Sequence, residues 1–163
     1  MADDLKIEIP APEQPPRSVG FLISQLGFFS ARGFAKELKP VGIEPREFLL
    51  LRFVAVTEGQ SQHALGEMLG VPASRMVALV DHLEERGLVE RRLDQEDRRI
   101  RALHLTKKGR QTLGRAIEVA IAYETRLCAP LAEGERDLLI DLLQKLQLPQ
   151  TELRGVHPGL VAE

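Results

Sequence analysis

Cysteine, tryptophan and long apolar runs are scarce or absent in this chain of 163 residues. Cys128 is the only cysteine, so no disulfide forms within the chain, and we expect the reducing cytoplasm as its location. Aromatic residues make up 4% of the chain and tryptophan is missing, which favours helices over a β-sandwich or barrel. No apolar run approaches about 18 residues and none follows a basic start, so we expect neither a membrane span nor a signal peptide.

Patterns typical of catalysis or metal binding are missing as well. The four histidines show no ligand spacing among themselves or with Cys128, and we interpret them as surface or hydrogen-bonded side chains. Neither a phosphate-binding glycine loop nor a Gly-x-Ser-x-Gly turn occurs. We interpret Cys128 as a small apolar helix residue; the alternative, a redox switch, needs an exposed electropositive site. We therefore expect no enzyme activity, no cofactor and no metal.

Charge is distributed unevenly along the chain. The net charge is −2, yet the segment from Arg86 to Arg110 holds nine Lys and Arg against four Asp and Glu, a local balance of +5. All other residues together therefore carry −7. A basic segment on an acidic body directs a nucleic acid to one face of a protein and keeps it off the rest.

The first part of the chain predicts an arm followed by two helices. Residues 1–17 contain four prolines and little periodicity, which predicts a flexible Pro-rich arm. Apolar residues then recur at helical spacing from Ser18, a suitable N-cap, to Leu38. A second helix is predicted from Arg46 to Glu58, with Pro45 in its first turn. Because it is apolar almost all round, we expect it to be central and buried.

The segment from Ser61 to Gly109 predicts two short helices and a hairpin. Ser61 caps a helix that runs to Leu69, Gly70 provides a left-handed turn, and Pro72 begins a helix that ends at Gly87. The inner stripe of this second helix is predicted to be Met76, Leu79, Val80 and Leu83. Two strands, 88–93 and 100–105, flank a six-residue charged loop. An exposed helix beside an arginine-tipped hairpin is suited to double-stranded DNA, with the helix in the major groove.

The last part of the chain predicts two more helices, over residues 107–129 and 133–146, separated by Pro130. Thr106 is the expected N-cap of the first. Together with the helix at 18–38, they carry more apolar surface than a small lobe covers. An obligate dimer interface would bury this surplus, so we expect a homodimer. Residues 148–163 show no strong period and are predicted to be a C-terminal tail. The fold class predicted is mainly α with a small β-hairpin wing.

Three motifs stand out in this chain: residues 65–71, residues 74–91, and Asp97-Arg98-Arg99 followed by Leu103-His104-Leu105-Thr106-Lys107-Lys108-Gly109. Together they resemble the multiple-antibiotic-resistance regulator (MarR) family of winged-helix repressors. The resemblance covers residues 21–146. It implies a winged-helix domain over 18–147, with a DNA-binding lobe at 45–105 and dimerisation helices at 18–38 and 107–147. It also implies a homodimer, a palindromic operator, and repression relieved by a small molecule or an oxidant.

The resemblance gives the hairpin tip a specific role. Arg99 corresponds to the wing arginine that enters the minor groove, and Asp97 would hold its guanidinium by a charge-assisted hydrogen bond. Arg98 would contact a phosphate. The alternative is that all three are solvated charges of an exposed hairpin.

Ser74 and Arg75 match the start of the family's recognition helix. Arg75 would read a guanine, or else contact a phosphate or remain a free side chain. The chain departs from the family pattern at Pro72, where a capping Ser or Thr is usual, and at Ala78, where Arg or Lys is common. We therefore expect the recognition helix to make fewer contacts with bases, with Ala78 and Val77 touching thymine methyl groups. The wing would then contribute more of the affinity for DNA.

Peroxide-sensing relatives place a reactive cysteine in the first long helix, where this chain has none, so a small organic effector is expected instead. The resemblance suggests aromatic acids or their thioesters. The residues expected to supply an apolar wall and an anion partner are Phe28, Phe29, Arg32, Phe48 and Arg52. The alternatives are core packing for the phenylalanines and an ion pair with a carboxylate for Arg52. A constitutive or architectural DNA-binding protein without an effector is the alternative function.

Overall fold

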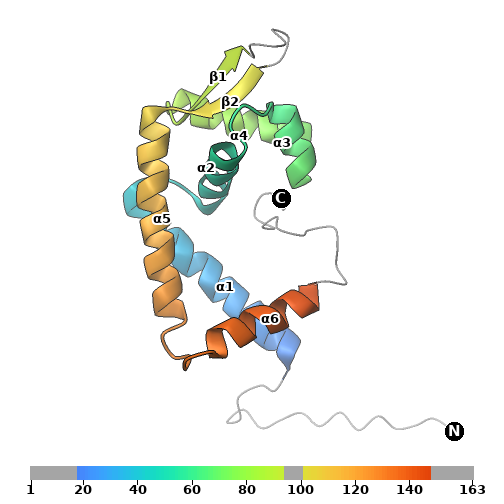
Figure 1. Cartoon of the computed structure of the whole chain (residues 1–163), viewed down its shortest axis with the longest axis vertical. Coiled ribbons are helices and arrows are strands. Elements are labelled where there is room, and N and C mark those ends of the chain that lie inside the picture. The colour runs from blue at the N-terminus through green and yellow to red at the C-terminus, as the bar shows by residue number, and fades with distance from the viewer. Residues whose placement is uncertain (1–17, 94–100, 148–163) are drawn as a thin grey trace, which may run out of the picture. The chain divides into compact units, whose positions relative to one another are not determined.

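The computed structural model describes residues 18–93 and 101–147, and the predicted arm, hairpin tip and tail lie outside them. The elements, in chain order, are α1 (Val19–Leu38), the 3-10 helix η1 (Lys39–Val41), α2 (Pro45–Val56), α3 (Gln62–Leu69), α4 (Ala73–Glu85), β1 (Val89–Leu93), β2 (Arg101–Leu105), α5 (Lys107–Leu127) and α6 (Glu135–Gln147) (Figure 1). This order confirms the predicted fold class. The chain divides into two compact units between Gly33 and Phe34.

The sequence signals for helix ends are confirmed at two caps. The backbone N–H of Ala64 donates to the hydroxyl oxygen of Ser61 over 3.1 Å, and the N–H of Gly109 donates to Thr106 over 2.9 Å. Each side chain thereby satisfies an amide that has no partner inside its helix. Gly70 ends α3 with φ at 62°, in the left-handed region that a side chain disfavours. The predicted bounds of α1, α3 and α4 agree with the structure within two residues.

The core of the second unit forms around α2, which contacts both α5 and β2. Its fully buried apolar residues include Leu50, Leu51 and Val54. The expectation that this helix is buried is wrong for Val56 at its end, which is 84% exposed. The expectation also missed that a carboxylate, Glu47, is among the buried residues of α2. The helix therefore has one buried face and ends in solvent.

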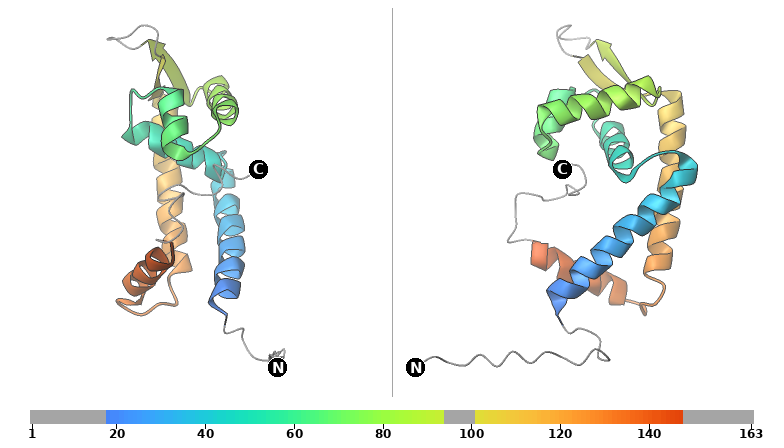
Figure 2. Two further views of the ribbon diagram at one scale, coloured as in Figure 1. Left: turned by 90° about the vertical axis from the view of Figure 1, so that its right-hand side faces the viewer. Right: turned by 180° about the vertical axis from the view of Figure 1, so that it is seen from behind.

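The predicted hairpin is present as an antiparallel pair in which Val89 lies opposite Leu105 and Leu93 opposite Arg101. An isolated bridge between Ser61 and Ala102 extends the pairing toward the start of α3. Both views in Figure 2 place the hairpin at the N-terminal end of α5. The hairpin thus joins α3, α4 and α5 at one place.

Several apolar side chains are exposed together on each of α1, α5 and α6. On α1 they are Val19, Phe21, Leu22, Ile23, Leu26, Phe28 and Phe29; on α5, Ile117, Ile121 and Leu127; and on α6, Leu138, Leu139, Leu142, Leu143 and Leu146. These helices contain the stripes from which a dimer was expected. Across residues 18–93 and 101–147, no helix is both long and apolar enough to cross a membrane.

Candidate nucleic-acid interface

One face of α4 is fixed to the core and the other is open. Met76, Val80 and Leu83 are buried, as predicted, and Leu79 is half-buried. Of the predicted DNA-facing residues, Ser74 and Ala78 are exposed and Arg75 is half-buried. The short side chains of Ser74 and Ala78 leave room for the helix to approach the floor of a DNA groove.

The turn between α3 and α4 is held by backbone hydrogen bonds. The N–H of Val71 donates to the carbonyl of Gly66 over 2.9 Å, and the N–H of Met76 donates to Pro72 over 2.9 Å. The carbonyl of Pro72 therefore accepts the first hydrogen bond of α4, and Pro72 provides no side-chain cap of the kind that is usual in the family. The departure from the family pattern leaves the helix start intact.

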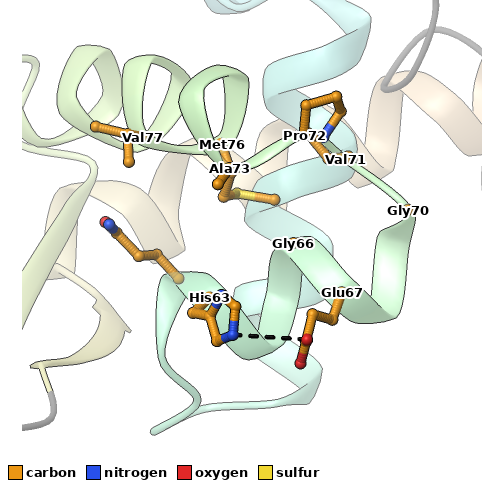
Figure 3. Close-up of a pocket in the computed structure, with 10 residues that line it drawn as sticks. His63, Gly66, Glu67, Gly70, Val71, Pro72, Ala73, Met76 and Val77 are labelled. Atoms are coloured by element: carbon orange, nitrogen blue, oxygen red, sulfur yellow. Dashed lines mark ion pairs between the residues drawn. The ribbon is translucent and has the colours of Figure 1, made fainter.

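A shallow groove of about 380 Å³ runs between α3 and α4. Figure 3 shows His63 and Glu67 of α3 on one side, 3.5 Å apart at the paired atoms, and Ala73 and Val77 of α4 on the other. The ion pair is solvent-exposed, and pairs of this kind contribute little to stability. The groove is therefore a surface feature of the two-helix unit.

Arg91 of β1 joins the hairpin to both helices. Its guanidinium donates to Gln62 Oε1 at 3.2 and 2.9 Å, and it also pairs with Asp81 and Glu84 of α4. Burial lowers the pKa of Arg91, but hydrogen bonds to Asp81 and Glu84 outweigh it and raise that pKa above its ordinary value. Arg91 is thus a permanent cation between three elements.

Glu47 holds the other end of α4. The residue is 2% exposed. Its carboxylate accepts from Arg86 over 2.6 Å, lies 3.0 Å from His82 Nε2, and accepts from the N–H of Glu44 over 2.7 Å. Arg86 also donates to the carbonyl of Gly42. The C-terminal end of α4 is therefore tied to α2 and to the segment before it.

The base of the hairpin carries a third charged cluster. Glu58 lies 3.1 Å from Arg110 and 3.3 Å from His104. The hydrogen bond from Arg110, followed by that from His104, lowers the pKa of the Glu58 carboxyl. At neutral pH this carboxylate is ionised and offsets part of the local positive charge.

The remaining predicted site residues are placed as follows. Asp97, Arg98 and Arg99 lie outside the described residues, so their roles stay predictions. In the first unit, Phe28 and Phe29 are 5.9 Å apart edge to face, with Arg32 5.2 Å above the ring of Phe28.

In the second unit, Phe48 is buried against Phe34, and Arg52 lies 5.7 Å from the ring of Phe48. The burial of Phe48 agrees with the core-packing alternative. Over the part of the chain that the structure describes, Arg52 is in none of the ion pairs. A ligand pocket built from these residues and those of the first unit stays a prediction.

Sequence reasoning missed Arg91 and Glu47. A signal existed for Arg91, since Asp81 and Glu84 lie three residues apart on one face of a helix and an arginine follows on the next strand. No signal distinguished Glu47 from an ordinary surface carboxylate. Across residues 18–93 and 101–147, no group of three or more His, Cys, Asp or Glu side chains is arranged to hold a metal ion.

Comparisons with known proteins identify the family. A family model described as "MarR family" matches residues 41–100. A protein of Thauera aromatica named as a transcriptional regulatory protein for the hcr operon is 33% identical over 141 residues, which cover 82% of this chain and 85% of that protein.

Two solved structures of repressors named CouR are also similar. The transcriptional repressor CouR bound to a 23-mer DNA duplex is 32% identical, with a TM-score of 0.71, over 79% of this chain and 92% of that chain. CouR from Rhodococcus jostii RHA1 bound to p-coumaroyl-CoA is 32% identical, with a TM-score of 0.68, over 82% of this chain and 94% of that chain. With the two-helix unit and hairpin described above, these similarities show that the chain belongs to the MarR family of winged-helix transcriptional regulators.

Proposed function

We propose that this protein is a cytoplasmic, homodimeric repressor that binds a palindromic operator and leaves it when a small aromatic acid or thioester binds. The observation that carries the proposal is the open face of α4, anchored by Met76, Val80 and Leu83 beside a hairpin. A helix held in this way presents its free side to the major groove. CouR, which has the same fold, is bound to a DNA duplex in one of its structures.

The exposed apolar faces of α1, α5 and α6 support the dimer. A monomer in water rarely leaves so many large apolar side chains uncovered, and an interface between two copies removes them from solvent. A twofold axis then repeats the recognition helix, so the operator should repeat about one helical turn away. Sedimentation at micromolar protein tests this point, and a monomer there would contradict it.

Arg99→Ala should weaken binding to the operator by more than about tenfold, because the lost guanidinium enters the narrow and strongly negative minor groove. The dependence of affinity on salt should flatten by about one phosphate contact or less. The probe is the duplex that the wild-type protein enriches from a random pool, measured by fluorescence anisotropy. Arg126→Ala is the matched control, since Arg126 lies on α5, forms an exposed ion pair with Glu37, and carries the same charge as Arg99. Equal affinities for wild type and Arg99→Ala would remove the wing from the mechanism.

A ligand of the proposed class should stabilise the protein and release it from DNA. At 100 times its dissociation constant, a ligand that binds only the folded state adds about 2.7 kcal/mol to the free energy of unfolding. Thermal melting with aromatic acids and their CoA thioesters, p-coumaroyl-CoA among them, measures this shift. CouR, with which this chain shares 32% identity, binds p-coumaroyl-CoA. No melting shift with any member of the panel would count against the effector.

The second candidate is a constitutive or architectural DNA-binding protein with no effector. The burial of Phe48 favours it, because a residue that packs in the core is not available to line a ligand pocket. Gel-shift titration distinguishes the two functions. A complex that no member of the panel dissociates, with normal DNA affinity, supports the second candidate.

A further inference from the structure

The open face of α4 continues from short side chains into a carboxylate. Ser74, Ala78 and Asp81 are four and then three residues apart, so they share one side of the helix. Ser74 and Ala78 are exposed, and the Asp81 side chain is 50% exposed. Glu84 follows one turn later and is half-buried. Two carboxylates therefore lie on or beside the surface that faces DNA in the proposed function.

Carboxylates in this position oppose DNA binding. The duplex carries one negative charge about every 1.7 Å along its axis, and unpaired acidic groups close to it repel it. The carboxylates of Asp81 and Glu84 are paired here, because both contact the guanidinium of Arg91. The Arg91 side chain is only 14% exposed, so these contacts are screened less than a surface ion pair.

The geometry around Arg91 also restricts where the carboxylates point. The backbone N–H of Arg91 donates to Glu84 Oε1 over 3.1 Å, in addition to the side-chain pair. The same guanidinium reaches Gln62 in the first turn of α3 at 2.9 Å. A cation held from three elements keeps its partners in one orientation, facing Arg91 of β1.

We propose that Arg91 is a positioning residue for DNA binding, which keeps Asp81 and Glu84 of α4 paired so that they do not repel the duplex. The inference rests on the DNA-binding function proposed above. It differs from a direct phosphate contact, in which Arg91 would act on DNA itself. It also differs from a purely structural role, in which only the stability of the fold would depend on Arg91.

The test is a double-mutant cycle in the full chain, read by DNA affinity. The variants are Arg91→Gln, Asp81→Asn with Glu84→Gln, and all three substitutions together. The probe is the duplex enriched by the wild-type protein from a random pool, at about 50 mM and about 200 mM salt. Arg92→Gln is the matched control, because Arg92 is the next residue on β1 and pairs with Glu90 in an exposed position. Thermal melting confirms that each variant is folded at the temperature of the measurement.

Arg91→Gln is expected to weaken DNA binding by about tenfold at the lower salt concentration. The loss should be smaller at the higher concentration, because salt screens the repulsion between the carboxylates and the duplex. Adding the two carboxylate substitutions to Arg91→Gln should return the affinity to within about threefold of wild type. The same two substitutions in the presence of Arg91 should change the affinity by less than about threefold, since the charges are already paired. Arg92→Gln should lose less than about threefold.

Three results would overturn the inference. The first is no recovery in the triple variant, as expected if Arg91 contacts phosphate. The second is an equal gain from the carboxylate substitutions with and without Arg91. The third is a loss in Arg92→Gln as large as in Arg91→Gln, since net charge alone would then explain both.

If Arg91→Gln does not fold, the DNA affinity of Arg91→Lys is measured instead, because lysine keeps the positive charge but lacks the planar set of donors of a guanidinium. Affinity within about threefold of wild type supports charge pairing, and a loss above about tenfold contradicts it. A wild-type protein that enriches no duplex refutes the proposed function instead. The two failures are therefore distinguishable.

Discussion

Gly109→Ala is expected to lower the free energy of unfolding by about 2–4 kcal/mol. A Cβ at this position would lie 1.9 Å from the carbonyl oxygen of Leu88 and 2.9 Å from its carbonyl carbon. Both are backbone atoms, so no side-chain rotation relieves the clash. The same carbonyl accepts from the N–H of Thr106 over 3.1 Å, and Thr106 caps α5. The substitution therefore separates α5 from the base of the wing, and urea denaturation measures the loss.

Gly114→Ala is the matched control for this result. Gly114 lies in the same helix, is exposed, and would place its Cβ more than 4 Å from the atoms of other described residues. Alanine should raise the free energy of unfolding there by about 0.5–1 kcal/mol, because it restricts the unfolded chain and favours helix. Equal effects of the two substitutions would show that the contact with Leu88 does not exist in solution.

Glu47→Ala is expected to cost about 3–5 kcal/mol of unfolding free energy. It removes the acceptor of Arg86 and the partner of His82, and it leaves the N–H of Glu44 without its side-chain acceptor. The partly buried guanidinium of Arg86 then loses its carboxylate partner, and breaking such a pair costs more than the intact pair contributes. Glu47→Gln should lose less than Glu47→Ala, since an amide oxygen still accepts from one of these donors.

Glu67→Ala is the control for this second prediction. Glu67 forms an exposed pair with His63 on α3, and its loss should change the unfolding free energy by less than about 0.5 kcal/mol. A Glu47→Ala variant as stable as Glu67→Ala would show that the junction of α2 and α4 is solvated. The two variants carry the same change in charge and differ in burial.

The sequence predicted the local elements well. Ser61 and Thr106 cap the helices that they were expected to cap, because capping depends on residues three positions apart. The inner stripe of α4 followed from helical spacing, since residues three and four apart share a face. The hairpin strands agree with prediction except at Leu88, which precedes β1, while Ile100 lies outside the described residues.

The contacts that position the interface were not predicted in the same way. The burial of Glu47 depends on Arg86, which is 39 residues away, and the chain around Glu47 gives no sign of this partner. In an almost uniformly apolar helix, the pattern does not show which side faces the core, and so Val56 was expected to be buried although it is exposed. The role of Arg91 requires α3, α4 and β1 to meet, which spacing along one element does not reveal.

By itself, the sequence determined which segments form helices and strands, where they begin, and to which family the chain belongs, because caps, periodicity and motifs are local properties. Only the tertiary structure decided that Gly109 must lack a side chain, that Glu47 is buried, and that Arg91 pairs the carboxylates of α4. These depend on atoms from distant parts of the chain coming within hydrogen-bonding or van der Waals distance. Such proximity is a property of packing, and no single segment of the chain carries it.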